Sequence, residues 1–268
     1  MCKVISVCNQ KGGVGKSASA ANLGIGLARA GQKVLVIDND AQGSLTASLG
    51  FNEPDTMEYT LATVLGKIIK EESYDPEEGI LHHQEGIDLM PGNIELSGID
   101  LTLVSVMSRE HVLSEYIESI KDRYSWIIID CAPSLGMLTV NALAASDSVL
   151  VPVQVGFLPA KGLEQLIRTI NKVRKQKINR NLRIEGILLT MVDGRTNYSK
   201  EIISLIEQAY GGNVKIFEKP IPLSVRVAEC SALGISIYRN DPKGKAALGY
   251  ESLTKEILGN PLNGGGAL

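Results

Sequence analysis

Residues that could bind phosphate lie near the start of the chain, directly after a short apolar run at residues 4–7. The glycines of this segment would let successive backbone N–H groups converge on anionic oxygens at a helix N-terminus. Lys16 would contact the β- and γ-phosphates of a nucleotide, and the Ser17 hydroxyl would bind Mg²⁺. The alternative is a glycine-rich turn whose lysines serve only solubility. A strand before the segment and a helix after it favour phosphate binding over that alternative. The candidate nucleotide ligands are Gly12, Gly13, Val14, Gly15, Lys16, Ser17 and Ala18.

This loop differs from the usual G-x-x-x-x-G-K-[ST] pattern at two positions. Gln10 stands where the pattern has glycine, and Lys11 adds a second lysine. Because Lys16 already occupies the β/γ-phosphate position, Lys11 could point outward, toward a nucleotide held by a partner. It would then act in trans, as an arginine finger does. From the residues alone this is a hypothesis.

Carboxylates follow two other apolar runs, and they could complete a nucleotide site. Asp38 and Asp40 follow residues 34–37, and Asp130 follows residues 126–129. Magnesium prefers oxygen ligands, and the carboxyl ends of neighbouring parallel strands would bring these side chains together. We expect Asp130 to hold Mg²⁺ through water. One of Asp38 and Asp40 would lie near the metal and the other would orient the attacking water, which gives γ-phosphate hydrolysis.

The elements that must position these residues alternate along the chain. Short apolar runs predict strands at 4–7, 34–37, 87–90, 126–129, 149–153 and 187–192, and periodic patterns predict helices at 17–30, 162–176 and 199–210. This alternation indicates an α/β fold with a doubly wound, mainly parallel sheet and helices on both faces. We expect one domain over residues 1–258, a surface insertion at 53–86, and a flexible tail at 259–268.

Composition narrows the class of protein. The 268 residues carry a net charge of −3 and include four scattered cysteines without a C-x-x-C pair. The strand-like start leaves no room for a signal peptide, and no run approaches the ~20 apolar residues of a membrane span. These features favour a cytoplasmic protein with reduced thiols. Residues 53–100 carry twelve acidic and two basic side chains, whereas 161–200 carry ten basic and three acidic ones, which allows a positive patch for a polyanion.

Taken together, five blocks resemble ParA/Soj-type partitioning ATPases, the deviant Walker A group that also contains MinD. The resemblance covers essentially the whole chain. It implies a P-loop NTPase-like fold, with ATP and Mg²⁺ as cofactors. The blocks lie at residues 9–17, 38–43, 130–136, 189–197 and 221–229.

The resemblance also implies individual roles. Lys11 would contact nucleotide across an ATP-dependent homodimer, and Asp40 would activate water. Asp38 and Asp130 would lie on the metal side with Ser17. In the two late blocks, Met191 and Pro222 would contact the nucleotide. Arg195 and Arg226 would bind double-stranded DNA without sequence preference, although each alone is an ordinary surface arginine.

The family further implies a ParB-type centromere-binding partner that stimulates hydrolysis, an association with the nucleoid, and no membrane. Two positions depart from the family pattern. Ala41 replaces a proline, and Leu223 stands where an additional arginine is common, which would weaken DNA binding. Neither change removes the metal-binding hydroxyl.

Three alternatives remain open. A MinD-like cell-division positioning ATPase needs a C-terminal amphipathic helix on the membrane, and the Gly/Asn tail does not resemble one. An iron–sulfur reductase needs a second cysteine beside Cys131, and none is obviously placed. A scaffold that binds nucleotide without turnover is disfavoured by the three intact aspartates.

Overall fold

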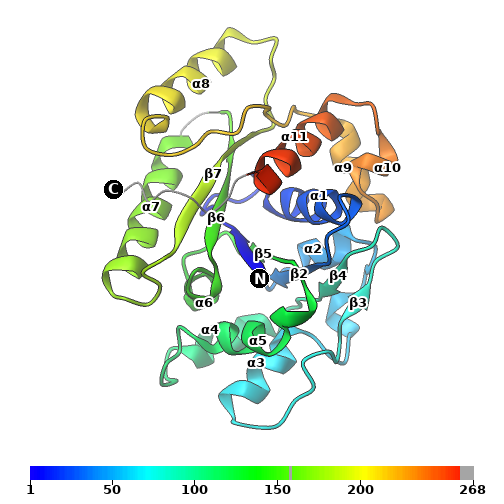
Figure 1. The fold of residues 1–268 in the computed structure, drawn as a ribbon, viewed down its shortest axis with the longest axis vertical. Coiled ribbons are helices and arrows are strands. Elements are labelled where there is room, and N and C mark those ends of the chain that lie inside the picture. The colour runs from blue at the N-terminus through cyan, green and yellow to red at the C-terminus, as the bar shows by residue number, and fades with distance from the viewer. Residues whose placement is uncertain (157–158, 260–268) are drawn as a thin grey trace.

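A central sheet separates two layers of helices in the computed structural model, which describes residues 1–156 and 159–259 (Figure 1). The seven strands in the described residues run in the order β3-β4-β2-β5-β1-β6-β7, and every neighbouring pair is parallel except β3 with β4. The strands are β1 (Lys3–Val7), β2 (Val34–Asn39), β3 (Leu81–His82), β4 (Asp88–Met90), β5 (Trp126–Cys131), β6 (Ser148–Gln154) and β7 (Arg183–Thr190). The predicted doubly wound α/β class is confirmed.

Helices cover both faces of this sheet, and each face has its own apolar core. One core packs under α1 (Lys16–Arg29), α2 (Ser44–Ser48), α9 (Val225–Leu233), α10 (Ile237–Asn240) and α11 (Lys245–Gly259). The other packs under α3 (Leu61–Ile69), α4 (Leu96–Leu103), α5 (Val112–Ile120), α6 (Met137–Ala145), α7 (Pro159–Lys175) and α8 (Asn197–Tyr210). Short 3₁₀ turns lie at Pro54–Thr56 and Lys121–Arg123. No described helix is long and apolar enough to cross a membrane.

Strand register places the candidate site at one edge of the sheet. The central strands β2 and β5 are buried along their whole length, as their continuous apolar sequence predicts. Asp130 of β5 pairs in register with Val7 at the end of β1 and with Asp38 of β2. The loop after β1 and both carboxylates therefore meet at the carboxyl edge.

The expected surface insertion at 53–86 is wrong. Leu61, Val64 and Leu65 of α3 are fully buried in the core, and the segment also supplies the antiparallel strand β3. Burying each such side chain contributes about 1.5–3 kcal/mol, so α3 is part of the domain core. Of the expected tail, Gly259 ends α11, and residues 260–268 lie outside the described residues.

Candidate nucleotide site

Backbone conformation explains why the loop between β1 and α1 needs its glycines. Gly13 and Gly15 have φ angles of 69° and 82°, in the left-handed region that side chains with a Cβ disfavour. Gly15 is the residue directly before α1, and no side chain caps the first turn of that helix. The free N–H groups of the helix N-terminus are therefore available to an anion.

Neighbouring strands hold the loop in place. Asn9 accepts a hydrogen bond from the Lys11 N–H (3.0 Å) and donates one to the Pro152 carbonyl at the end of β6 (2.7 Å). Thr190, at the end of β7, donates to the Val14 carbonyl (2.9 Å). Sequence reasoning did not identify Asn9 and Thr190 as residues that fix the loop to the neighbouring strands, although Asn9 lies at the start of the loop sequence.

The two lysines of the loop differ in their surroundings. Lys16 is buried, and its ammonium donates to the Lys11 carbonyl (3.3 Å), so it lies across the mouth of the loop. The Lys11 side chain is exposed and has no ion-pair partner among the described residues. Lys16 is thus placed to serve a nucleotide in its own loop, whereas Lys11 is accessible to another molecule.

Asp38 is fully buried and well satisfied by hydrogen bonds. Its Oδ2 accepts from the backbone N–H and the hydroxyl of Thr46 (2.8 and 2.7 Å), and its Oδ1 accepts from the Asp40 N–H (3.3 Å). Burial nevertheless raises the pKa of Asp38 to about 6, against the opposing hydrogen bonds from Thr46. Sequence reasoning did not identify Thr46 as its partner.

Asp130 is fully buried, and neither of its carboxylate oxygens has a hydrogen-bond partner among the described residues. Burial, and next the nearby charge of Asp38, hold the pKa of Asp130 well above its usual range, while Ser17 and Lys16 act in the opposite direction. An unpartnered buried carboxylate facing the phosphate loop is the arrangement that a bound cation would complete. The residues present therefore fit Mg²⁺.

A cation here would need ligands from outside the protein. Among residues 1–156 and 159–259 no group of three or more His, Cys, Asp or Glu side chains is placed to hold a metal ion. Magnesium commonly binds through one or two protein oxygens together with substrate phosphates and waters. Ser17, Asp38 and Asp130 match that pattern.

Asp40 lies at the rim of the same cluster and is almost fully buried. Its Oδ1 accepts a hydrogen bond from the Gln42 N–H (3.1 Å). This bond orients the carboxylate and leaves Oδ2 without a hydrogen bond from the described residues. Asp40 is therefore the carboxylate of the three that has both access to solvent and a fixed orientation.

The structure places Met191 beside the loop and Pro222 on the segment bridged to Val192. Met191 has a φ angle of 51°, and its Cε lies 3.9 Å from where a Cβ on Gly15 would be. Val192 forms a parallel bridge with Pro222, which aligns the two late blocks of the sequence. Met191 is thus packed at the site, and Pro222 lies on the segment paired with the next residue, Val192.

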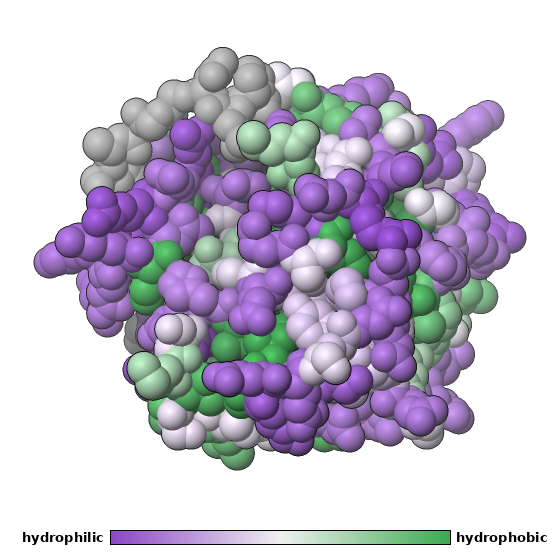
Figure 2. All heavy atoms as spheres, turned by 60° about the horizontal axis from the view of Figure 1, so that its bottom comes forward, coloured by the Kyte–Doolittle hydropathy of each residue, from purple (hydrophilic) through white to green (hydrophobic). Residues whose placement is uncertain are grey.

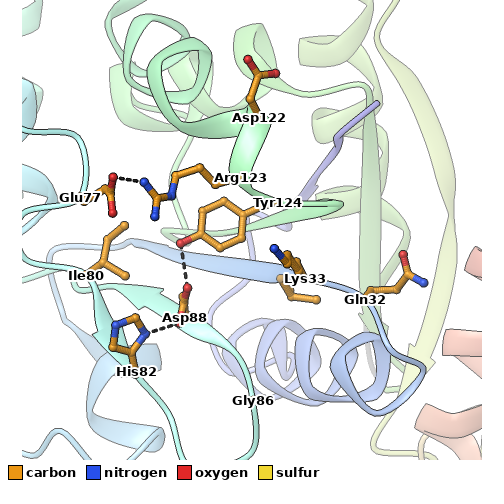
Figure 3. Close-up of a pocket in the computed structure, with 11 residues that line it drawn as sticks. Gln32, Lys33, Glu77, Ile80, His82, Gly86, Asp88, Asp122, Arg123 and Tyr124 are labelled. Atoms are coloured by element: carbon orange, nitrogen blue, oxygen red, sulfur yellow. Dashed lines mark hydrogen bonds and ion pairs between the residues drawn. The ribbon is translucent and has the colours of Figure 1, made fainter.

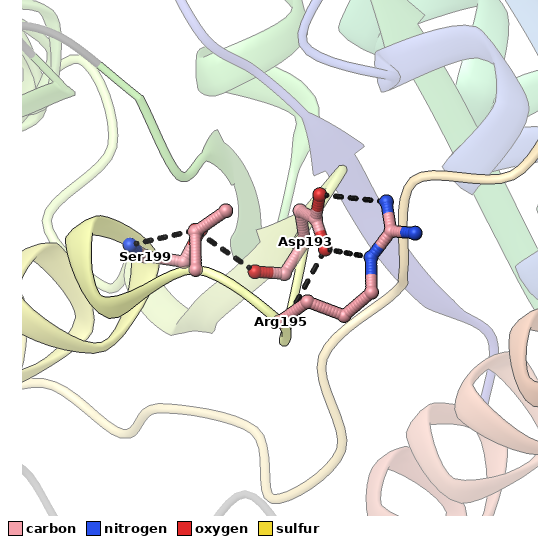
Figure 4. A network of polar contacts seen from close by, with 4 residues as sticks. Asp193, Arg195 and Ser199 are labelled. Atoms are coloured by element: carbon pink, nitrogen blue, oxygen red, sulfur yellow. Dashed lines mark hydrogen bonds and ion pairs between the residues drawn. The ribbon is translucent and has the colours of Figure 1, made fainter.

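Arg195 and Arg226 are exposed, and both form surface ion pairs. Arg195 Nε lies 2.9 Å from Asp193 Oδ1, and Figure 4 shows the guanidinium folded back onto that carboxylate. Arg226 pairs with Glu229 on α9 (2.9 Å). Exposed pairs of this kind contribute about 0–1 kcal/mol, so another anion can displace the carboxylate. The bridge between the two late blocks places the two arginines on adjacent segments.

A cavity of about 580 Å³ lies at the opposite, amino edge of the sheet (Figure 3). Asp88 accepts hydrogen bonds from Tyr124 (2.8 Å) and pairs with His82 (2.5 Å), and Arg123 pairs with Glu77. Its charged groups thus largely satisfy one another, and none of the predicted site residues lines it.

Comparisons with known proteins agree with this geometry. A family model described as an AAA domain matches residues 2–184. The sporulation initiation inhibitor protein Soj of Bacillus subtilis is 39% identical over 265 residues, covering 97% of this chain and all of that protein. The chromosome partitioning protein ParA of Caulobacter vibrioides is 35% identical, covering 96% of this chain and 94% of its own length.

Among solved structures, one described as cobyrinic acid a,c-diamide synthase of Mycobacterium smegmatis with bound ADP and magnesium is 33% identical. It has a TM-score of 0.83 and covers 96% of this chain and 94% of its own. The names of these similar proteins span more than one chemistry. A shared fold therefore leaves the function to be argued from the site.

Proposed function

The chain belongs to the Soj/ParA family of chromosome-partitioning proteins, and we propose that residues 1–258 form one Mg²⁺-dependent ATPase domain that segregates DNA. The observation that carries the proposal is the unpartnered, buried Asp130 carboxylate facing the phosphate loop. The magnesium and ADP bound in the similar Mycobacterium smegmatis structure support the same cofactors here.

Each residue of the site has a role in this proposal. The N–H groups of residues 12–18 bind the nucleotide phosphates, with Met191 and Pro222 beside them. Lys16 neutralises the β- and γ-phosphates. Ser17, Asp38 and Asp130 would hold Mg²⁺, which would supply charge neutralisation at the phosphate oxygens.

Hydrolysis then depends on positioning a water molecule. Asp40 accepts a proton as the water oxygen attacks the γ-phosphorus, and the bond to the β-phosphate oxygen breaks to release ADP and phosphate. The exposed Lys11 of a second copy adds positive charge to the γ-phosphate, so turnover requires an ATP-bound homodimer.

DNA binding follows from the same dimer. Arg195 and Arg226 contact duplex phosphates, and dimerisation doubles this surface, so ATP increases DNA affinity without touching DNA. The protein thereby associates with the nucleoid. A ParB-type centromere-binding partner stimulates hydrolysis and returns the protein to the monomer.

A DNA-binding series tests the proposal. Filter binding of random-sequence duplex DNA is measured with ATP and with ADP over 50–200 mM salt. Wild type should bind with ATP and lose affinity steeply as salt rises, because phosphate contacts release counterions. Lys16→Ala should not respond to ATP, and Arg195→Ala/Arg226→Ala should bind weakly with a shallower salt slope.

The matched control for the arginine pair is Arg168→Ala/Lys172→Ala, which removes two cations from the exposed face of α7. Equal binding of wild type with ATP, ADP or no nucleotide would contradict the switch. Equal losses in both double variants would mean that general positive charge, and not the two late arginines, binds DNA.

The MinD-like alternative is less well supported by α11. Tyr250, Leu253 and Ile257 of this helix are buried against the protein core, and only Leu248 and Leu258 among its large apolar side chains are exposed. The buried side chains are therefore not presented as the apolar face of a membrane-surface helix.

A further inference from the structure

Hydrophilic side chains cover most of the face that carries α3, α4 and α5, with hydrophobic ones between them (Figure 2). A polar side chain enclosed by the core instead needs a hydrogen-bond partner there, because burying it without one is costly. Thr46, on the short helix α2, is fully buried, and its backbone N–H and its hydroxyl both donate to Asp38. Thr46 therefore connects α2 to a carboxylate of the candidate nucleotide site.

The hydroxyl of Thr46 has a fixed direction. A hydroxyl carries one proton, and it can accept a hydrogen bond as well as donate one. It donates to Asp38 Oδ2 (2.7 Å) and accepts from the Gly92 N–H, in the segment after β4 (3.1 Å). Because the Gly92 N–H can only donate, the hydroxyl proton must point toward Asp38. A donor aimed at an ionised carboxylate makes one of the stronger hydrogen bonds in a protein.

The two oxygens of Asp38 differ as a result. Oδ2 accepts both bonds from Thr46, one from its backbone N–H (2.8 Å) and one from its hydroxyl (2.7 Å). Oδ1 accepts a single, longer bond from the Asp40 N–H (3.3 Å). Two donors on Oδ2 oppose rotation of the carboxylate. Thr46 thus decides that Oδ1 is the oxygen that stays available to a cation or to water bound to it.

The same contacts close a loop that contains Asp40. Thr46 follows Asp38 by eight residues, and within this loop the Gly43 N–H donates to the Asp40 carbonyl (2.9 Å). The Asp40 N–H and both donors of Thr46 bond to one carboxylate, that of Asp38. The carboxylate proposed to accept a proton from water is thereby held in place relative to the carboxylate on the metal side.

Close packing prevents the backbone from replacing the hydroxyl. A Cβ on Gly92 would overlap the Asp38 carbonyl oxygen, and a Cβ on Gly43 would lie 2.9 Å from the Gly92 carbonyl oxygen. The end of β2, the start of α2 and the segment after β4 therefore pack backbone against backbone around Thr46. Loss of the hydroxyl would take one donor from Asp38 at a place where no neighbouring segment can move closer.

We propose that Thr46 is a positioning residue of the magnesium site, whose hydroxyl orients the Asp38 carboxylate for Mg²⁺ and holds the loop of Asp40 beside it. The inference rests on the proposed ATPase function and deepens it by naming a residue outside the phosphate loop on which metal affinity depends. Thr46 acts through Asp38 and is not itself a ligand. Groups that hydrogen-bond to metal ligands change metal affinity by about ten- to a hundredfold when they are removed.

The test measures the need for Mg²⁺ and not turnover. Thermal unfolding is followed at saturating ADP while Mg²⁺ is added, and each protein is compared with its own Tm in ADP alone, because bound ligand raises Tm. Thr46→Val keeps the shape of the side chain and the backbone N–H but removes the hydroxyl. It should need about ten- to a hundredfold more Mg²⁺ than wild type for the same rise in Tm. Thr46→Ser keeps the hydroxyl and should respond as wild type does.

The matched control is Thr254→Val on α11. Thr254 is also a buried helical threonine, and its hydroxyl donates to the Tyr250 carbonyl (2.8 Å) and lies beside Tyr238 and Gly26. This variant should lower Tm without changing the Mg²⁺ requirement. If Thr46→Val does not fold, Thr46→Cys is compared with Thr46→Ser, and it should need more Mg²⁺ because a thiol is a weak donor.

Three outcomes would overturn the proposal: an unchanged Mg²⁺ requirement in Thr46→Val, an equal increase in Thr254→Val, or a response of Thr46→Ser like that of Thr46→Val. If ADP and Mg²⁺ do not raise the Tm of wild type, the proposed function fails instead. Amide hydrogen exchange without ligand then still tests the positioning role. Residues 40–46 should exchange faster in Thr46→Val than in wild type and Thr254→Val, and equal exchange in all three would remove that role.

Discussion

The two edges of the sheet both carry acidic side chains, and they differ in whether those side chains have partners. At the carboxyl edge, Asp130 is fully buried, and neither of its oxygens has a hydrogen-bond partner in the part of the chain that the structure describes. At the amino edge, Asp88 accepts from Tyr124 and pairs with His82 (Figure 3). A cavity of about 580 Å³ lies at the amino edge, where Asp88 has partners.

This difference shows which observation carries functional information. A buried charge without a partner destabilises the folded protein, so it persists where a ligand completes it. Paired and partly exposed charges contribute about 0–1 kcal/mol and need no ligand. The unsatisfied carboxylate is therefore the better indicator of a ligand site, and the presence of a cavity alone is not.

The largest expected contrast is in hydrolysis. Asp40→Ala should lower the rate of phosphate release by about a thousandfold, within the range for loss of a general base, and should leave ATP binding intact. Asp88→Ala, at the amino edge, should release phosphate at the wild-type rate. Phosphate release and binding of a fluorescent ATP analogue measure the two properties. A comparable loss in both variants would remove the functional distinction between the edges.

A second contrast is in the pH dependence of stability without Mg²⁺ or nucleotide. Because burial raises the pKa of Asp38 to about 6, the folded protein binds this proton more tightly than the unfolded chain does. The resulting stabilisation is present below pH 4 and is lost as pH rises through 6. A change from the usual 3.8 to about 6 corresponds to about 3 kcal/mol.

The side chain introduced by Asp38→Asn stays neutral at every pH, so this variant should lose less stability than wild type over this range, and the decline that remains comes from Asp130, whose pKa burial also raises. The contribution of Asp38 is the difference in unfolding free energy between this variant and wild type, measured by urea unfolding in EDTA at pH 4, 5, 6 and 7. The control Asp88→Asn should follow wild type. If Asp38→Asn and wild type lose stability in parallel from pH 4 to 7, the buried carboxylate is already satisfied in the free protein.

A third, smaller effect concerns magnesium. Mg²⁺ with ADP at about a hundred times Kd should stabilise wild type by about 2.7 kcal/mol. Asp130→Asn removes the unpartnered carboxylate, so it should gain about as much from ADP alone as wild type does and less from adding Mg²⁺. Thermal unfolding with ADP, with and without Mg²⁺, measures the difference. An equal magnesium increment in both proteins would place the metal away from Asp130.

Much of this site could be predicted from the sequence because it depends on local patterns. The glycine spacing predicts the phosphate loop, and an apolar run followed by aspartate predicts Asp38 and Asp130 as site residues. Parallel strands end at the same edge, so their proximity followed from the predicted sheet. Five of the six predicted strands coincide closely with observed ones. The two-residue strand β3 was not predicted, and β7 spans Arg183–Thr190 and not 187–192, because residues 191–192 leave the strand to bridge the segment at Pro222.

Two of the contacts that were missed join residues far apart in the chain. Thr190 holds Val14 across 176 positions, and Asp100 holds Leu138 across 38. No spacing rule reports such pairs. We expected a surface insertion at 53–86, a segment with a large excess of acidic residues, but the apolar side chains of α3 are buried in the core. Net charge describes the outer face of a helix and says little about its inner one.

The smallest expected effect lies at the amino edge. Tyr124→Phe removes the hydrogen bond to Asp88 and should lower the unfolding free energy by about 1 kcal/mol, the usual contribution of one such bond. Phosphate release should not change. The His82 contact keeps Asp88 partly satisfied, so the loss should be larger in His82→Ala/Tyr124→Phe than the two single losses together. Urea unfolding of the four proteins measures this coupling, and simple additivity would mean that the amino-edge charges do not act as a satisfied network.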